Sequence, residues 1–232
     1  MGNLGYMLRE LRFDVTHPSV GVLDIYGRFI LSSLLAKLSG APNLSTEALY
    51  WEYYCKNAIH DPPEWWDSSI TKGRYNPEMR LILEILRKDF GDGVRLIDVG
   101  SGPVTSFFSY LDVYAWDVTT VDPLARLYNS LNKKYHINYP LECTEGYGES
   151  VSKLFPPESF HLVFSQNAID HSRAPKEFVK NLYNLLKPNG FLYVTGFVNE
   201  GEASGWTGLH QHNLTVRMIV SSGRAVIEPQ MK

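Results

Sequence analysis

The sequence contains few cysteines, and those present form no pattern. Cys55 and Cys143 are the only two, and they lie far apart in the chain. A disulfide framework needs several paired cysteines, and a thiolate zinc site needs closely spaced ones. Both are therefore excluded, which fits a reducing compartment and predicts a cytoplasmic protein. We expect both side chains to be buried as small hydrophobic groups.

A surplus of positive charge is also missing. The 22 Lys and Arg residues are outnumbered by 25 Asp and Glu, which gives a formal net charge of −3. The basic residues are scattered, so there is no stripe of the kind that neutralises a row of phosphates. The composition argues against a nucleic-acid partner and favours a small-molecule substrate.

Long hydrophobic runs are absent as well. The most apolar helical stretch, residues 22–38, is interrupted by Asp24, Arg28 and Lys37, and it is shorter than the roughly 20 apolar residues that a bilayer requires. The N-terminus lacks the basic-then-apolar order of a secretory signal. We interpret residues 22–38 as an amphipathic helix and predict no membrane association.

The chain divides into two regions of different pattern. Residues 1–76 have helical spacing and an aromatic cluster but no strand-like run, which predicts a helical N-terminal cap. Residues 77–232 begin with a helix from Pro77 and continue as alternating units. The predicted strands are 94–99, 116–121, 139–143, 160–165 and 190–197, and the predicted helices between them are 104–112, 123–135 and 175–186. This alternation predicts an α/β fold with a doubly wound, mostly parallel sheet.

The C-terminal end is expected to be short. The residues after Phe197 suffice for one helix near 213–220 and one short strand, "RAVIE". An uncovered edge strand invites pairing with another chain, so a homodimer contact is an expectation.

A glycine turn is the strongest motif. In "RLIDVGSGPV" an apolar run ends at Asp98 and is followed by Gly100 and Gly102. Such a turn lets the backbone approach a nucleotide-like cofactor, although any strand-to-helix turn can look the same. The next strand ends at Asp122, about 20 residues further on, where a ribose-binding acid is expected. Alternatively, Asp122 caps the helix that Pro123 begins.

The turn favours a cationic cofactor over a dinucleotide. A pyrophosphate site needs a third glycine at the helix start, and this chain has Pro103, Val104 and Thr105 there. The carboxylate of Asp98 would also repel phosphate and attract a cation. An NAD-dependent oxidoreductase is therefore the less favoured alternative.

Five segments together resemble the class I S-adenosylmethionine-dependent methyltransferases. They are "LIDVGSGPVTSF", "TTVDP", "EGYGES", "SFHLVFSQNAIDH" and "LLKPNGFLYVTG", and they span residues 94–197 in the order and spacing of that family. The resemblance implies a Rossmann-like methyltransferase fold that binds S-adenosyl-L-methionine. The implied cofactor-binding residues are Arg74, Asp98, Gly100, Ser101, Gly102, Asp122, Pro123, Tyr147, Gly148, Glu149, Gln166 and Asn167.

The resemblance also assigns parts of the cofactor to these residues. It implies that the methionine part lies at the glycine turn, the ribose at Asp122 and the adenine near "GYGE". Two positions depart from the family pattern: Val104 stands where the last glycine is usual, and Tyr147 stands where an acid often accepts the adenine amino group. Tyr147 could equally be an exposed loop residue, and Arg74, which could reach the cofactor carboxylate, could equally be solvated.

Three polar residues follow the fourth predicted strand, namely Asn167, Asp170 and His171. Ligands bind at this carboxyl edge of open α/β sheets, so these residues are candidates for the acceptor side. Methyl transfer to a hydroxyl needs alignment and a base. We expect His171 to be that base, with His210 or His212 as second choice. Each of the three could instead be purely structural.

The loop 199–213 follows the fifth predicted strand and contains Glu200, Trp206 and the two histidines His210 and His212. Trp206 could supply an apolar wall for the acceptor. The spacing of the histidines could suggest a metal, but no matching third ligand stands out, so no metal site is predicted.

These observations predict a cytoplasmic S-adenosylmethionine-dependent methyltransferase that acts on a small molecule, with oxygen favoured as the acceptor atom. A non-catalytic binding subunit that keeps the fold is the alternative from another class.

Overall fold

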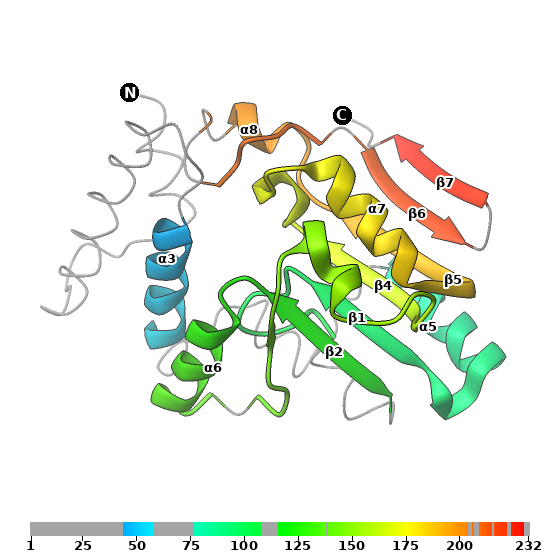
Figure 1. The fold of residues 1–232 in the computed structure, drawn as a ribbon, viewed down its shortest axis with the longest axis horizontal. Coiled ribbons are helices and arrows are strands. Elements are labelled where there is room, and N and C mark those ends of the chain that lie inside the picture. The colour runs from blue at the N-terminus through cyan, green and yellow to red at the C-terminus, as the bar shows by residue number, and fades with distance from the viewer. Residues whose placement is uncertain are drawn as a thin grey trace, which may run out of the picture.

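A single sheet organises the fold (Figure 1). The structure is a computed structural model that describes residues 44–57, 77–107, 116–137, 139–203, 206, 209–214, 216–221 and 224–229. Within these ranges, the strands form a 7-stranded sheet in the order β3-β2-β1-β4-β5-β6-β7. Neighbours are parallel from β3 to β5, and β6 and β7 are antiparallel. The predicted doubly wound, mostly parallel α/β fold is confirmed.

The strands and helices have the following bounds. The strands are β1 Arg95–Val99, β2 Asp117–Asp122, β3 Thr144–Glu145, β4 Phe160–Gln166, β5 Leu186–Thr195, β6 Val216–Ser221 and β7 Arg224–Pro229. The α-helices are α3 Leu44–Asn57, α5 Pro77–Phe90, α6 Ala125–Lys134, α7 Pro175–Leu185 and α8 Glu200–Ala203, and the 3-10 helices are η1 Gly91–Gly93, η3 Gly148–Lys153 and η4 Ile169–His171.

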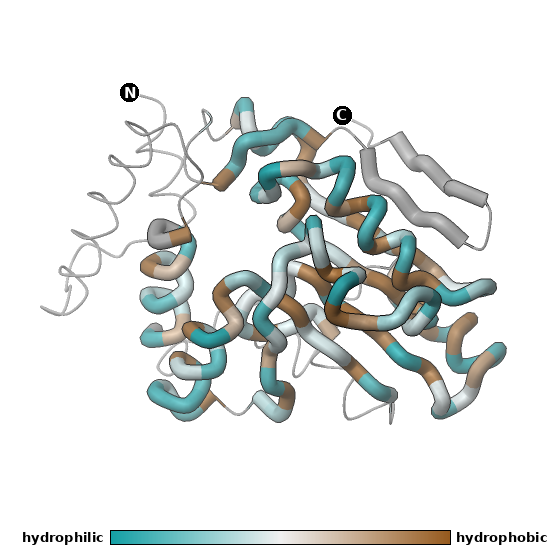
Figure 2. The backbone as a smooth tube through the Cα atoms, viewed as in Figure 1, coloured by the Kyte–Doolittle hydropathy of each residue, from teal (hydrophilic) through white to brown (hydrophobic). Residues whose placement is uncertain are grey.

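The core lies on both faces of the sheet. On one face Ile97 and Val163 pack against α7 through residues such as Leu182, and on the other Leu96 packs against α5 through Leu86. Successive residues of β1 therefore contact opposite helices, which is why Leu96, Ile97 and Val99 are all apolar and do not follow a simple alternation with polar residues. Figure 2 shows apolar segments along these central strands.

Both covering helices begin as the sequence predicts. Pro77 and Pro175 stand at the first helical positions of α5 and α7, where a missing N–H is tolerated. Apolar residues recur at helical spacing along α7, and Phe178, Leu182 and Leu185 are buried. The predicted strands 94–99, 116–121 and 160–165 and the helices from Pro77, at 123–135 and at 175–186 are confirmed to within a few residues.

The predicted helix 104–112 is wrong in its described part. Residues 103–107 form turns, and residues 108–112 lie outside the described ranges. The Thr105 hydroxyl donates to Asp98, and the Thr105 amide N–H donates to the phenol oxygen of Tyr139. These bonds hold Thr105 in the turn that follows the glycines.

The predicted strand 139–143 is also wrong, since β3 contains only Thr144–Glu145. The amide N–H of Cys143 donates to the Asn129 side chain, and the Cys143 carbonyl accepts from the same side chain. A helix residue thus occupies both backbone groups that a strand would use.

The helix predicted near 213–220 is wrong, because strand β6 occupies this segment. β6 pairs antiparallel with β5 on one side and with β7 on the other. The strand expected at "RAVIE" is confirmed as part of β7. The strand predicted at 190–197 begins earlier, at Leu186, because "KPNG" continues the strand, with Asn189 at φ 63, instead of ending the helix.

The predicted cap is described only at α3, and its boundary with residues 77–232 stays a prediction, as does a homodimer contact. Residues 22–38 lie outside the described ranges. No helix in the described part of the chain is long and apolar enough to cross a membrane. Cys55 and Cys143 are free and buried, as predicted.

Candidate functional site

The glycine turn, Gly100 to Gly102, directly follows β1 at the carboxyl edge of the sheet. Gly100 and Gly102 have φ values of 79 and 64, a left-handed conformation that L side chains rarely adopt. A Cβ atom on Gly100 would lie 2.2 Å from the Cβ of Ala168. The Gly100 amide N–H donates to the Val121 carbonyl over 2.8 Å. The turn is therefore packed against both neighbouring strands, β2 and the end of β4.

Asp122 at the end of β2 holds this turn. Its Oδ2 accepts a hydrogen bond of 3.1 Å from the Gly102 amide, and its Oδ1 accepts one of 2.8 Å from the Leu124 amide. The second bond closes a turn before α6. The capping alternative is wrong, because α6 begins at Ala125 with Leu124 at its N-cap position and has no side-chain capping bond. Burial raises the pKa of Asp122 to about 7, although both amide N–H groups favour its charged form.

Asp98 lies beneath the turn rather than open at its surface. Only 2% of the residue is exposed, and its Oδ2 accepts a 2.5 Å hydrogen bond from the Thr105 hydroxyl. Burial raises the pKa of Asp98 to about 7, against the lowering effect of the Thr105 hydroxyl. Since β1 and β2 pair side by side, with Asp98 beside Thr120 and Val99 beside Val121, the two strand ends that carry Asp98 and Asp122 are adjacent.

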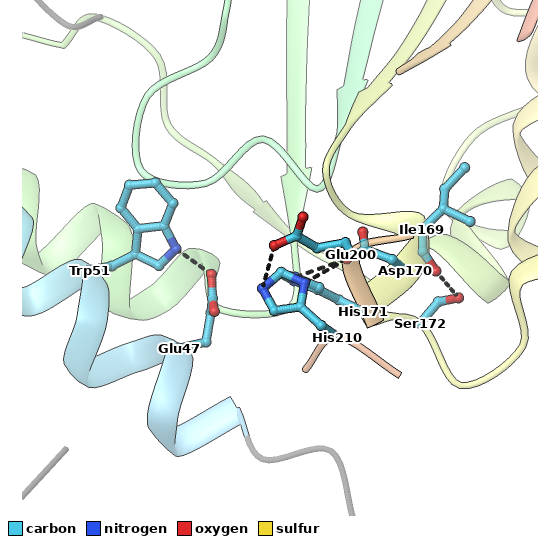
Figure 3. Close-up of polar contacts among 8 residues, drawn as sticks. All are labelled: Glu47, Trp51, Ile169, Asp170, His171, Ser172, Glu200 and His210. Carbon is cyan, nitrogen blue, oxygen red and sulfur yellow. Dashed lines mark hydrogen bonds and ion pairs between the residues drawn. The ribbon is translucent and has the colours of Figure 1, made fainter. Parts of the chain in front are cut away.

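Helix α3 forms a wall over the glycine turn, which sequence reasoning missed. The Trp51 ring lies 3.4 Å from the position that a Cβ on Gly102 would take. The indole N–H donates to Glu47 over 2.6 Å (Figure 3). Lys134 of α6 pairs with Glu52 of α3 over 3.3 Å and helps to hold the helix there. The aromatic cluster was visible in the sequence, but no motif linked it to the turn.

A second polar group lies beyond the end of β4 and is formed by Asp170, His171 and His210 (Figure 3). The His210 Nδ1 is 2.7 Å from the Asp170 Oδ2, and the His171 Nε2 is 3.1 Å from the same His210 nitrogen. We call these three residues the His–Asp cluster. The Gln211 amide N–H donates to the Asp170 carbonyl, which joins the segment 209–214 to η4.

Charges in the His–Asp cluster stabilise one another. Burial opposes ionisation of Asp170, but the His210 hydrogen bond and the two histidine charges lower the pKa of its carboxyl group. Burial also disfavours protonated His210, yet the hydrogen bond and charge of Asp170 outweigh it and raise the pKa of His210. Glu200 lies on the other side of the His210 ring, with its Oε1 3.9 Å from Nε2.

The cluster lies close to the glycine turn. Ala168, which packs against Gly100, directly precedes η4, and η4 carries Asp170 and His171. The charge of Glu47 on α3 acts on both Asp122 and His210. His210 rather than His212 therefore joins His171, a selection that the sequence left open.

The remaining predicted residues surround the turn at different depths. Tyr147 is 49% exposed, whereas Gly148 is buried and a Cβ there would collide with the Phe178 ring. The Glu149 carboxylate accepts from the Arg173 amide over 2.8 Å. The GYGE segment is thus anchored at Gly148 and Glu149 and presents the Tyr147 ring to solvent.

Residues at the end of β4 and near β2 complete the set. Gln166 Oε1 accepts from the Ser106 hydroxyl, and Asn167 has φ 50 and donates its amide N–H to Thr195. Ser101 Oγ lies 3.6 Å from Cys143 Sγ, and Pro123 is half-buried directly after Asp122. Arg74 lies outside the described residues.

Comparisons with known proteins address the same segment. A family model described as "Methyltransferase domain" matches residues 97–194. The chain is 23% identical over 208 residues to a sterol 24-C-methyltransferase of Candida albicans, a match that covers 75% of this chain and 55% of that protein.

Solved structures match with low similarity. The YcgJ protein from Bacillus subtilis is 19% identical with a TM-score of 0.38, over 50% of each chain. An arsenic(III) S-adenosylmethionine methyltransferase from Chlamydomonas reinhardtii is 22% identical with a TM-score of 0.35, over 44% of this chain and 38% of that one. The chain spans about half the length of the relatives it matches.

Proposed function

Because residues 97–194 form a class I S-adenosylmethionine-dependent methyltransferase domain, we propose that the chain transfers a methyl group from this cofactor to an oxygen of a small-molecule acceptor. One observation carries the proposal: the glycine turn held by Asp122 and the His–Asp cluster follow neighbouring strands at the same carboxyl edge of the sheet. Ligands of open α/β sheets bind at this edge.

The turn suits a cationic nucleoside cofactor. Its two left-handed glycines allow close approach of a ligand to the backbone. A bound cation would favour the charged forms of Asp98 and Asp122, whose pKa burial raises to about 7. Asp122 Oδ1 and Oδ2 each accept one amide N–H bond, and a carboxylate oxygen has a second lone pair for a ribose hydroxyl. When bound, S-adenosylmethionine supplies an electrophilic methyl group on its sulfonium.

Other predicted residues would extend the same site. In the proposal, Gly100, Ser101 and Gly102 line the methionine part, Pro123 lies beside the ribose, and Tyr147, Gly148 and Glu149 border the adenine. Gln166 and Asn167 lie between the cofactor and the acceptor. Trp51 of α3 covers the turn at Gly102 and excludes water from the transfer.

Proton removal is assigned to the His–Asp cluster. An acceptor hydroxyl becomes a better nucleophile when a positioned base takes its proton during the attack. His171 is half-buried and contacts His210, which in turn is held by Asp170. In the proposal His171 accepts the proton, and His210, held by Asp170, positions the His171 ring.

The surroundings support a small acceptor. The net charge of −3 offers no basic surface for nucleic acid, and a half-buried pair of histidines suits one hydroxyl group better than a polymer. Oxygen is favoured over nitrogen or carbon because the site contains a histidine that can take the proton of a hydroxyl. A cytoplasmic location and a homodimer belong to the same proposal.

Thermal unfolding with added cofactors tests the proposal. A ligand that binds only the native state raises the midpoint temperature by mass action. We expect S-adenosylhomocysteine and S-adenosylmethionine to raise the midpoint and NAD to leave it unchanged. Donor consumption is then measured against matched hydroxylated and aminated small compounds. Stabilisation without turnover on any compound would favour a non-catalytic binding subunit, and stabilisation by NAD alone would contradict the proposal.

A further inference from the structure

The His–Asp cluster brings three electron-rich atoms to one point. The Asp170 Oδ2 is 2.7 Å from the His210 Nδ1 and 3.5 Å from the His171 Nε2, and the two nitrogens are 3.1 Å apart. These atoms come from two segments, η4 and the stretch 209–214, that are separated in the chain by α7, β5 and α8. The fold, rather than sequence proximity, therefore produces the triangle.

The triangle has the dimensions of a metal-binding face. A transition-metal ion with ligand bonds of about 2.1 Å separates neighbouring ligand atoms by about 3.0 Å in octahedral and about 3.4 Å in tetrahedral geometry. The three distances in the cluster, 2.7, 3.1 and 3.5 Å, surround these values. An ion could therefore bind all three atoms after shifts of a few tenths of an ångström.

Hydrogen bonds alone satisfy the three atoms poorly. If the His210 Nδ1 carries a proton, it donates this proton to Asp170. The lone pair of the His171 Nε2 then faces an N–H that is already bonded to Asp170. A proton on the His171 Nε2 can be donated to the His210 Nδ1 over 3.1 Å, but the His210 Nδ1 and the Asp170 Oδ2 then face each other at 2.7 Å with no proton between them. A cation at the centre would accept all three lone pairs at once.

The surroundings orient the histidine as a metal ligand needs. The His210 Nε2, on the far side of the ring from the cluster, faces the buried Glu200 carboxylate at 3.9 Å. At this distance the carboxylate makes no hydrogen bond, but its charge favours a proton on Nε2, the tautomer that leaves Nδ1 free to bind. The Gln211 amide N–H fixes the backbone of Asp170 at the same time. Only 3% of Asp170 is exposed, so water competes weakly for its carboxylate.

We propose that Asp170, His171 and His210 form a binding site for one divalent transition-metal ion. Two imidazoles and one carboxylate are the ligand types of zinc and of first-row ions such as cobalt, manganese and iron, whereas magnesium and calcium prefer all-oxygen sites. Three protein ligands leave further coordination positions open. In the sequence, His212 is the histidine nearest to His210. In the structure, the atoms that lie beside His210 belong to Asp170 and His171.

A bound ion has a consequence that rests on the proposed function. An acceptor hydroxyl that occupies an open coordination position has its pKa lowered by the ion. With the ion bound, the acceptor hydroxyl would lose its proton to solvent water, and His171 would act as the base only in the metal-free protein. The ion site itself requires neither cofactor nor acceptor.

The test measures ion binding in the full chain without a histidine tag, cofactor or acceptor. Isothermal titration with Zn²⁺ is expected to give one ion per chain, and magnesium is expected to give no binding at the same concentrations. His171→Ala and His210→Ala are expected to weaken Zn²⁺ binding by at least about tenfold. His212→Ala is the matched control, because this histidine lies in the same segment outside the cluster, and its affinity should equal that of the wild type.

A second measurement keeps the proposal testable if a variant fails to fold. The absorption spectrum of Co²⁺ in the wild-type protein is expected to show the bands of nitrogen and oxygen ligation without thiolate charge transfer. Strong thiolate bands would assign the ion to Cys55 or Cys143 and overturn the site. Absence of Zn²⁺ binding, or equal binding by wild type and a folded His171→Ala/His210→Ala double variant, would overturn it as well. Ion binding without methyl transfer would contradict only the proposed function.

Discussion

The Gly102 amide N–H donates a hydrogen bond to Asp122 Oδ2 over 3.1 Å, so the glycine turn after β1 is tied directly to the acid that ends β2. A single carboxylate therefore fixes the shape of the turn and stands beside it. In the proposed function the same carboxylate holds the cofactor ribose. Changes at Asp122 should thus affect cofactor binding twice, through the lost ligand and through the loosened turn.

Asp122→Ala is expected to weaken S-adenosylhomocysteine binding by at least about tenfold, because each lost charge-assisted hydrogen bond contributes about 1.5–3 kcal/mol. Isothermal titration measures the affinity. Asp117→Ala is the control. Asp117 begins the same strand and is exposed, and in the described residues its carboxylate pairs with Arg95. Equal affinities in Asp122→Ala and wild type would remove Asp122 from the cofactor site.

His171→Ala is expected to lower turnover by about 100-fold or more, the usual effect of removing a proton-transfer group, while the affinity for S-adenosylhomocysteine changes little. Single-turnover methyl transfer and cofactor titration measure the two quantities separately. His136→Asn, an exposed position at φ 53 that asparagine tolerates, serves as the control. Unchanged turnover in His171→Ala would show that this histidine has no part in the transfer.

Three glycine variants separate backbone strain from steric collision. Gly93→Ala meets nothing within 4 Å and should change the free energy of unfolding by less than about 0.5 kcal/mol. Gly91→Ala has open space but φ +62, so it should cost about 1–2 kcal/mol. Gly100→Ala combines φ +79 with a 2.2 Å approach to Ala168 and should cost clearly more than Gly91→Ala. Chemical denaturation gives these values, and equal costs for Gly91→Ala and Gly100→Ala would contradict the close packing of the turn.

Asp98→Asn is expected to change how stability depends on pH. Burial raises the pKa of Asp98 from its usual 3.8 to about 7, so between these values the folded protein keeps a proton that the unfolded chain has lost. Stability from this group is therefore present at low pH and lost as pH rises toward 7. From pH 5 to pH 7, the wild type should lose about 2 kcal/mol of unfolding free energy relative to the variant.

Taking the difference between wild type and Asp98→Asn cancels the other titrating groups that both proteins share. Asparagine still offers an oxygen to the Thr105 hydroxyl, so the variant should remain folded. Denaturation at several pH values measures the difference. A difference that stays constant with pH would show that Asp98 is ionised throughout this range.

The sequence by itself determined the central strands β1, β2 and β4, the helices α5, α6 and α7, and the residues of the glycine turn. The apolar run of β1, the proline starts of α5 and α7 and the acids Asp98 and Asp122 act through local backbone geometry and burial on two faces, which neighbouring residues largely specify. The predicted helix 104–112 and the predicted strand 139–143 were wrong. At both places a side chain distant in the sequence bonds to the backbone: Tyr139 at Thr105 and Asn129 at Cys143.

Only the tertiary structure decided which polar residues share a site. The choice of His210 over His212, the convergence of Asp170 with His171 and the position of Trp51 over Gly102 all depend on packing between segments far apart in the chain. The spacing of residues in the sequence carries no information on such distances. The physical reason is that side-chain chemistry is local, whereas the separation of two side chains is set by how the helices and strands between them pack against the sheet.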